Sequence, residues 1–196
     1  MPEVGLVLLA AGQSRRMGSP KQLLDVGGAP MLRRAAQSAL ASRCRPVVVV
    51  CGAAAHTVGR TVADLPLQLV HNPDWEQGIG TSIHAGIEAM SKHRVEATIL
   101  ALADQPLLTA GVFDRLVDTW LSRQLSIVAS EYDGTLGVPA LFDRSLFPGL
   151  LALPGDQGCK GFILGQPVDL VARSACPQAG IDIDTPDEYA RLLESL

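Results

Sequence analysis

The sequence predicts an α/β fold in which helices cover both faces of a mostly parallel, doubly wound sheet, giving three αβα layers. Short apolar runs alternate with segments whose apolar residues recur at helical spacing, a pattern typical of parallel sheets. The run Val47-Val48-Val49-Val50 is apolar throughout, as expected of a strand buried on both faces. With 196 residues the chain can build a sizeable core, and we expect a single domain over residues 1–196.

The apolar runs place the expected strands at residues 4–10, 46–51, 67–71, 98–103, 126–131 and 168–173. Helical periodicity places helices at residues 30–42, 56–63, 81–91 and 109–123.

The stretch 132–165 is less regular. The pair Asp133-Gly134 indicates a turn, residues 138–142 a short strand in a hairpin, and residues 154–158 a loop. A last helix is expected after Thr185, because Pro186 suits a first helical position and Glu188 completes a capping box.

Composition excludes several functional classes. The net charge of −4 argues against a general nucleic-acid binder, which needs a basic surface. The scattered cysteines have no metal-ligand spacing and are expected to be free thiols. No apolar run is long enough to span a membrane and no basic leader precedes the first one, so we expect a cytoplasmic enzyme that binds neither membrane nor nucleic acid.

Residues 9–21, Leu-Ala-Ala-Gly-Gln-Ser-Arg-Arg-Met-Gly-Ser-Pro-Lys, follow the first expected strand and are the most informative stretch. Small residues let a backbone approach a ligand, and Arg15, Arg16 and Lys21 add positive charge. The stretch is neither a P-loop nor a dinucleotide fingerprint, because the spacing from Gly12 to Gly18 and Lys21 fits neither pattern. It predicts a cradle for a polyanion, with a nucleoside triphosphate as the obvious ligand.

Acidic residues are expected at the same edge of the sheet. Asp104 directly follows the expected strand 98–103, while Asp182 and Asp184 alternate in an extended segment and point the same way. Carboxylates beside a triphosphate need an intervening cation, and Mg²⁺ is the usual one. Taken singly, Asp104 could be a turn acid and Asp184 a helix-entry acid; together with the basic loop they favour a metal site.

A further glycine-containing stretch follows the third expected strand. Gly78 and Gly80 would allow a base or ribose to lie against the backbone, and Thr81 or Ser82 could form a hydrogen bond to it or cap the next helix. Trp75 is interpreted as a core residue in preference to a stacking platform.

These stretches resemble the nucleotidyltransferases that act on molybdenum cofactor, along essentially the whole chain. The motifs that carry the resemblance are Leu9-Ala10-Ala11-Gly12-x-Ser14-Arg15-Arg16-Met17-Gly18-x-x-Lys21, Asn72-Pro73-x-Trp75-x-x-Gly78-x-x-x-Ser82, Leu102-Ala103-Asp104-Gln105-Pro106, Gly155-Asp156-x-Gly158 and Asp182-Ile183-Asp184-Thr185-Pro186. The resemblance implies a Rossmann-like sheet and transfer of a nucleoside monophosphate from a nucleoside triphosphate to a phosphorylated acceptor.

The resemblance also implies roles for particular residues. Arg16, Lys21 and Asp104 are expected to be catalytic, Asp104, Asp184 and less firmly Asp182 to hold Mg²⁺, and Gly155, Asp156 and Gly158 to lie on the acceptor side. The expected nucleotide-binding residues are Leu9, Ala10, Ala11, Gly12, Ser14, Arg15, Arg16, Lys21, Asn72, Gly78 and Ser82.

Within this family, the alanine at position 11 resembles the cytidylyltransferase branch, since guanylyltransferases typically have glycine at that position. We therefore expect transfer of CMP from CTP to a molybdopterin-type acceptor, with a molybdoenzyme or insertion chaperone as partner. The alternatives are transfer from GTP, another acceptor such as a sugar phosphate, or a non-catalytic nucleotide- or cofactor-binding carrier. A nucleotide-dependent oxidoreductase is disfavoured by the missing dinucleotide fingerprint.

Overall fold

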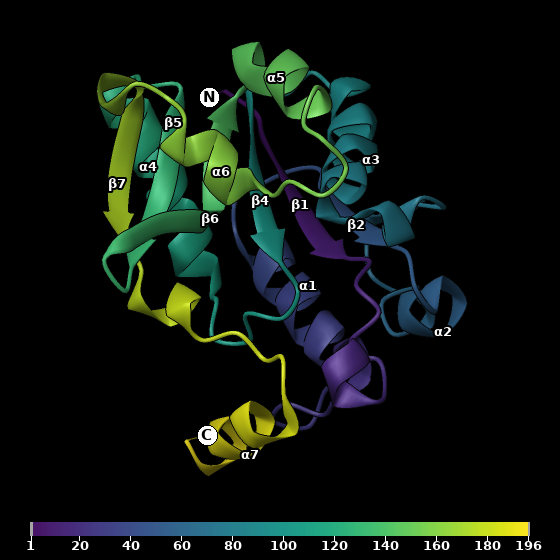
Figure 1. Ribbon diagram of the computed structural model, residues 1–196. Helices are drawn as coiled ribbons and strands as arrows, with labels where there is room; N and C mark the ends of the chain where they lie inside the picture. Colours follow the sequence, from purple (N-terminus) through teal and green to yellow (C-terminus); the bar gives the residue numbers. More distant parts are fainter. Residues whose placement is uncertain (1, 196) are drawn as a thin grey trace.

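The computed structural model describes residues 2–195, and its centre is a seven-stranded sheet (Figure 1). The strands run in the order β3-β2-β1-β4-β6-β5-β7, and only β6 is antiparallel to its neighbours. Their bounds are β1 Val4–Ala10, β2 Val47–Cys51, β3 Gln68–His71, β4 Ala97–Leu102, β5 Ile127–Tyr132, β6 Thr135–Asp143 and β7 Val171–Ala175. The mostly parallel sheet is confirmed.

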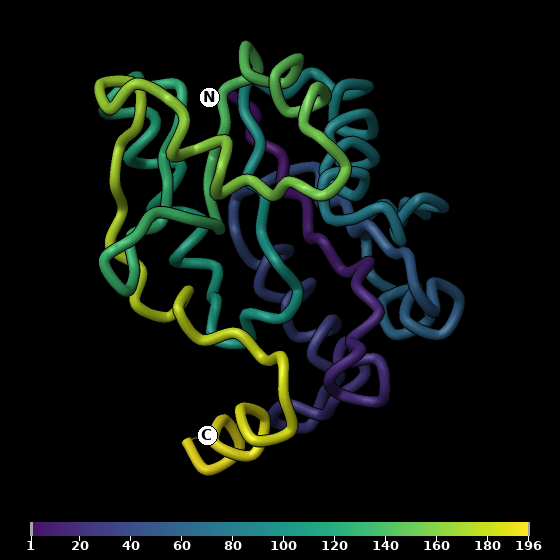
Figure 2. Tube along the Cα trace, in the orientation of Figure 1, coloured from purple at the N-terminus to yellow at the C-terminus, as the bar shows by residue number. Residues whose placement is uncertain are grey.

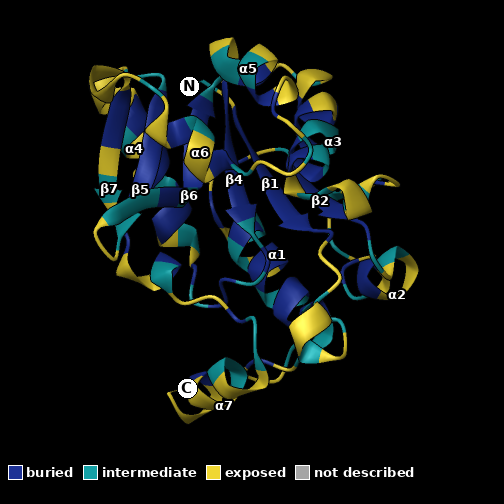
Figure 3. Cartoon of the chain, in the orientation of Figure 1, coloured by how far each residue is buried: buried dark blue, intermediate teal, exposed yellow. Residues whose placement is uncertain are grey.

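Helices cover both faces of this sheet, as predicted. Alternate residues of β1 face opposite layers: Leu6 packs with α1, α2 and α4, whereas Val7 packs with α3, α5 and α6. Figure 3 shows the central strands, among them β1, β2 and β4, almost entirely buried between these layers, whereas the edge strands β3 and β7 are partly exposed. The helices are α1 Met31–Ala41, α2 Ala55–Arg60, α3 Ile79–Ser91, α4 Ala110–Arg123, α5 Phe147–Leu151, α6 Cys159–Leu164 and α7 Pro186–Glu194.

The β5–β6 hairpin and the last helix form as the sequence predicts. Asp133 and Gly134 both take left-handed conformations, with φ of 49° and 71°, as a two-residue hairpin turn requires. At the start of α7 the Thr185 side chain accepts a hydrogen bond from the Glu188 backbone, and the Glu188 carboxylate accepts one from Thr185 N.

Two features differ from the sequence-based expectation. The last strand begins at Val171, because residues 168–170 form a 3₁₀ turn instead of the first part of the strand. The short helices α5 and α6 lie in the stretch that shows no clear periodicity, and each is too short to display a repeating apolar face.

The topology brings distant segments to one edge of the sheet. Leu9 in β1 pairs with Leu102 in β4, so the segments that follow both strands emerge side by side. The C-terminal segment returns across this edge, where Ile183 N donates a hydrogen bond of 3.1 Å to Asp104 O (Figure 2). Ile183 also packs with Val26, Met31 and Leu192, which anchors α7 beside the N-terminal loop.

Within residues 2–195, none of the helices combines the length and the apolar character needed to cross a membrane.

Candidate active site

The buried side chain of Gln22 fixes the backbone of the loop that follows β1. Its amide nitrogen donates to the backbone oxygens of Ala10 and Gly12, at 3.0 and 2.9 Å, and the residue is only 3% exposed. A glutamine can satisfy two carbonyl groups in this way because its NH₂ group carries two hydrogens. Gln22 therefore fixes the backbone at the point where the sequence predicts that the polyanion binds.

Ser14 stabilises the remainder of this loop. It adopts a left-handed conformation (φ 58°), and its hydroxyl accepts a hydrogen bond of 3.0 Å from Lys21 N while donating to the Gln22 side chain. Gly18 also lies in the left-handed region (φ 70°), which glycine enters without steric cost. The two turns return the chain to the sheet edge, so that the Lys21 side chain enters the site.

Lys21 joins the carboxylates of Asp104 and Asp184. Its Nζ lies 2.5 Å from Asp104 Oδ2 and 2.6 Å from Asp184 Oδ1, and only 12% of its side chain is exposed. Arg16 binds the second oxygen of Asp184 at 2.5 Å from the solvent side, with 67% of its side chain exposed. The structure thus brings together all the residues for which catalytic roles are expected.

The charges in this cluster alter one another's protonation equilibria. Burial alone would lower the pKa of Lys21, but the charges and hydrogen bonds of Asp104 and Asp184 outweigh burial and raise it. Burial alone would raise the pKa of Asp184, yet Lys21 and then Arg16 hold it below its usual value. Asp182 has no such compensation, and partial burial together with the charges of Asp104 and Asp184 raises its pKa.

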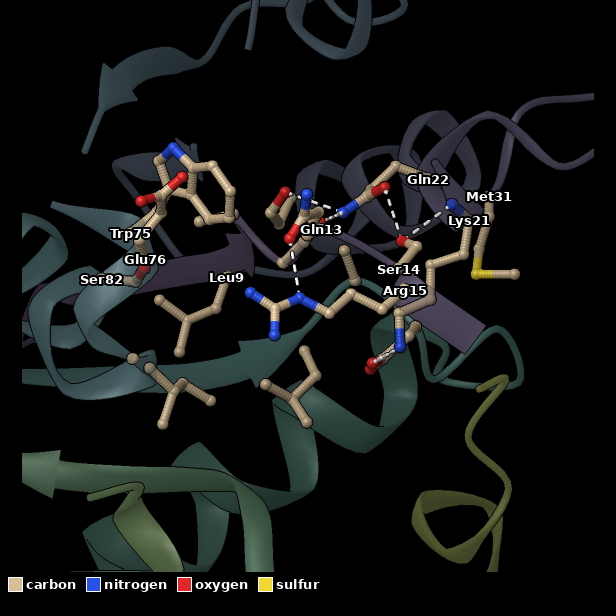
Figure 4. Close-up of a pocket in the computed structure, with 18 residues that line it drawn as sticks. Leu9, Gln13, Ser14, Arg15, Lys21, Gln22, Met31, Trp75, Glu76 and Ser82 are labelled. Carbon is tan, nitrogen blue, oxygen red and sulfur yellow. Dashed lines mark hydrogen bonds and ion pairs between the residues drawn. The ribbon is translucent and has the colours of Figure 1, made fainter. Parts of the chain in front are cut away.

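A cavity of about 420 Å³ lies beside this cluster. Figure 4 shows Trp75, Glu76 and Ser82 at one end and Lys21 and Met31 at the other, with Arg15 between them. Arg15 is positioned by a hydrogen bond of 2.8 Å from its Nε to Gln13 Oε1. Among the expected nucleotide-binding residues, the lining includes Leu9, Ala10, Ala11, Gly12, Ser14, Arg15, Lys21, Gly78 and Ser82, but not Arg16 or Asn72.

Gly78 and Gly80 pack closely against protein, which gives their small size a structural reason. A Cβ at Gly80 would lie 2.2 Å from Pro154 O, and one at Gly78 would lie 2.5 Å from Gly155 O. Gly80 N also donates a 2.8 Å hydrogen bond to Gly155 O. The glycines therefore let the loop around Gly155 approach the start of α3, although Gly78 still lines the cavity.

The expected acceptor-side residues Gly155, Asp156 and Gly158 do not line the cavity themselves. They lie behind the wall that residues 78–79 form, and a Cβ at Gly158 would contact Ile79 Cγ2 at 3.5 Å. These three residues therefore lie next to the residues that form the cavity wall but are not part of the lining.

Asn72 supports the wall from behind. Its side-chain amide donates to the hydroxyls of Thr81 and Ser82, at 2.9 Å each, which orients Ser82 at the cavity. Trp75 is half-buried, lines the cavity and belongs to none of the apolar core clusters of the described residues, so the interpretation of Trp75 as a core residue is wrong.

Gln105 has a structural role that its place in a motif does not reveal. The side chain is 3% exposed and donates to Val138 O at 3.1 Å and to Ala179 O at 2.7 Å. It thereby ties β6 to the segment that delivers Asp182 and Asp184. In the sequence, Gln22 and Gln105 each stand next to a charged residue of the expected site, and this is the feature that could have identified them. The sequence alone does not show to which backbone carbonyls their amide groups donate hydrogen bonds.

The cysteines offer no nucleophile here. All of them are free and buried, as the sequence predicts. Burial raises the pKa of Cys51 to about 11 and that of Cys159 to about 12, so neither is a thiolate at neutral pH.

The acidic residues fit a divalent cation that also binds substrate. Asp104 Oδ1 is buried and accepts no hydrogen bond from the described residues, which leaves it free to act as a ligand. Across residues 2–195 no group of three or more His, Cys, Asp or Glu side chains forms a complete metal site. A site with one or two carboxylates is typical of Mg²⁺, which keeps phosphate oxygens and water as its other ligands.

The Gln22 contacts generate a prediction about stability. Gln22→Leu leaves the carbonyls of Ala10 and Gly12 without their donor, and we expect it to lower the free energy of unfolding by about 1–3 kcal/mol. Urea denaturation measures the change. Gln37→Leu, on the exposed side of α1, is the control, with an expected change within about 0.5 kcal/mol. Equal stabilities of the two variants would contradict the role given to Gln22.

Comparison with known proteins identifies relatives whose names refer to different biochemical roles. Nicotine blue oxidoreductase of Paenarthrobacter nicotinovorans is 35% identical, covering 98% of each chain. Purine catabolism protein PucB of Bacillus subtilis is 31% identical, over 93% of this chain and 92% of the relative. Molybdenum cofactor cytidylyltransferase of Escherichia coli is 26% identical, over 96% and 95%.

Solved structures agree with this relationship. Rv0371c from Mycobacterium tuberculosis H37Rv superposes with a TM-score of 0.85 at 30% identity, and its complex with manganese with 0.80 at 27% identity, each covering 100% of both chains. Residues 6–170 match the MobA-like NTP transferase domain. The chain therefore belongs to the MobA-like NTP transferase family.

Proposed function

We propose that the protein transfers CMP from CTP to a molybdopterin-type cofactor, in a Mg²⁺-dependent reaction that releases pyrophosphate. The observation that carries the proposal is the convergence of Lys21, Asp104 and Asp184 at one end of the cavity. The family supports the use of a nucleoside triphosphate, and the name of the Escherichia coli relative supports the choice of CTP and of the acceptor.

The loop after β1 binds the triphosphate in this proposal. The backbone of residues 10–12, fixed by Gln22, lies against the phosphates, while Arg15 and Lys21 supply positive charge from the cavity lining. Gly78 and Ser82 contact the base or sugar at the opposite end, near Trp75. The acceptor approaches past the loop that contains Gly155, Asp156 and Gly158.

The reaction requires no protein nucleophile. An oxygen of the acceptor's terminal phosphate forms a bond to the α-phosphorus of CTP, while the bond from that phosphorus to the oxygen that bridges the α- and β-phosphates breaks. Pyrophosphate leaves with the electron pair of the broken bond, and Lys21 and Arg16 offset its charge. Orientation of the two phosphates and neutralisation of charge provide most of the rate acceleration in such a transfer.

Asp104 and Asp184 hold the Mg²⁺, with Asp182 as the neighbouring carboxylate. When bound, Mg²⁺ neutralises charge on the phosphate oxygens of both substrates. The unpartnered Asp104 Oδ1 supports a divalent cation at this position, and the manganese complex of the 27% identical structure supports the use of a divalent cation in general.

Ala11 contributes to the choice of base. A Cβ at Gly52 would lie 2.8 Å from the Ala11 Cβ and 2.6 Å from the Trp75 Cβ, so these three residues are packed closely together. Both Ala11 and Trp75 line the cavity, and in this proposal the Ala11 methyl group limits the space in which the base lies.

A second candidate is an oxidoreductase that holds a nucleotide cofactor in the same cavity. It is favoured by one observation, the name of the 35% identical relative from Paenarthrobacter nicotinovorans. The pair of acids that meets Lys21 favours the transferase, because a hydride transfer has no need for a divalent cation beside the phosphates. The remaining alternatives are another nucleotide, another acceptor, and a non-catalytic carrier.

A substrate screen distinguishes these candidates. The protein is incubated with Mg²⁺, one nucleoside triphosphate and purified molybdopterin, and pyrophosphate release is measured. We expect release only with CTP and molybdopterin together. Release with GTP and molybdopterin, but not with CTP and molybdopterin, would change the assignment of the base. Consumption of NADH or NADPH in the presence of an organic dye, without pyrophosphate release, would support the oxidoreductase.

The metal role of Asp104 is tested by Asp104→Asn. We expect turnover to fall by about a hundredfold or more, since removal of one transition-state charge contact costs about 10²–10³ in rate. Pyrophosphate release is the measurement and circular dichroism verifies the fold. The exposed Asp169→Asn in η5 (Val168–Leu170) is the matched control and should retain full turnover. Near-normal turnover of Asp104→Asn excludes the proposed metal role.

The role of Ala11 is tested by Ala11→Gly. Loss of the methyl group opens the wall beside Trp75, and we expect the preference for CTP over GTP, as the ratio of kcat/KM values, to decrease. An unchanged ratio would remove Ala11 from the determinants of base choice.

A further inference from the structure

Lys21 occupies the place between two carboxylates that the proposed metal would need. Its Nζ binds one oxygen of Asp104 and one of Asp184, and the side chains of Lys21 and Asp104 are only 12% and 18% exposed. A divalent cation shared by these carboxylates would lie within a few ångströms of the ammonium group, because metal–oxygen bonds are about 2.0–2.1 Å long for Mg²⁺. Two cations cannot share that space without strong repulsion.

We infer that Lys21 and a divalent cation are mutually exclusive occupants of the Asp104–Asp184 pair, and that a bound triphosphate decides between them. The inference rests on the proposed function, because it uses the metal role of these acids. In the nucleotide-free protein Lys21 neutralises the carboxylates; when phosphates enter the cavity, Lys21 turns to them and the carboxylates become available to the metal.

The geometry lets the Lys21 side chain move while its backbone stays in place. Lys21 N is bonded to Ser14 Oγ, and the next residue, Gln22, is anchored to the loop carbonyls. The four-carbon side chain is flexible, and Lys21 already lines the cavity, so a rotation of the side chain brings Nζ to the phosphates. Arg16 cannot take the same part, since it contacts Asp184 alone and from the exposed side.

This arrangement couples the two ligands thermodynamically. A triphosphate that draws Lys21 away strengthens metal binding, and by reciprocity a metal that displaces Lys21 strengthens triphosphate binding. The protein therefore binds the metal weakly on its own and binds it well as part of a nucleotide complex.

The first test measures Mn²⁺ affinity without nucleotide, by titration calorimetry. We expect Lys21→Met to bind Mn²⁺ at least about fivefold more tightly than the unaltered protein, the lower end of typical coupling between linked sites. Arg16→Met is the matched control: it also removes a cation from Asp184, but not the one that bridges both acids. Equal gains in the two variants, or no gain in Lys21→Met, would overturn the inference.

Thermal unfolding shows whether Lys21→Met is still folded. Without Lys21 the two carboxylates repel one another, and we expect a lowered Tm that Mn²⁺ restores, with a larger rise than in the unaltered protein. A Tm of Lys21→Met that does not respond to Mn²⁺ contradicts competition for the pair.

The second test uses inorganic tripolyphosphate in a metal-free buffer. Asp184→Asn releases one of the two anchors of Lys21, and we expect tripolyphosphate to bind several-fold more tightly. Asp182→Asn removes the same charge from the same segment, and equal gains in both variants would reduce the effect to general electrostatics and overturn the inference. Neither test uses CTP, molybdopterin or turnover, so a wrong substrate assignment would leave both results unaffected.

Discussion

The ion pairs of Lys21 with Asp104 and Asp184 connect three segments that lie far apart in the chain. The loop after β1, the end of β4 and the segment before α7 meet at these ion pairs and at the adjacent backbone bond between Ile183 and Asp104. Each carboxylate, partly removed from water, would be costly without a cation beside it. The cluster therefore stabilises the arrangement of the site and keeps both acids paired with a cation.

The parallel sheet makes this meeting possible. β1 and β4 are neighbours and run in the same direction, so both of their following segments leave at one edge. Uncharged contacts then do the fine positioning. Gln22 binds the carbonyls of the loop after β1, and Gln105 connects β6 to the segment leading to Asp182. Both glutamines are buried, and both donate hydrogen bonds to backbone carbonyls that shape the site.

The relatives show that one scaffold is associated with proteins of different names, including an oxidoreductase and a cytidylyltransferase. Function in such a scaffold depends on the residues of the site and not on the fold. In this chain the candidate site has two ends in one cavity: a charged end with Lys21 and Asp104, and an end with Trp75 and Ser82. In the proposed function, the charged end carries out the chemistry and the other end determines the choice of ligand.

The sequence by itself determined the layered sheet, the hairpin at Asp133-Gly134, the capped last helix and the set of charged residues that form the site. These follow from local rules: apolar periodicity, turn conformations and capping depend on near neighbours in the chain. Only the tertiary structure decided that Lys21 bridges both acids, that Gly78 and Gly80 make room for the loop at Gly155, and that Trp75 lines the cavity. Such contacts join residues separated by many positions, and they depend on how the strands and loops pack in space.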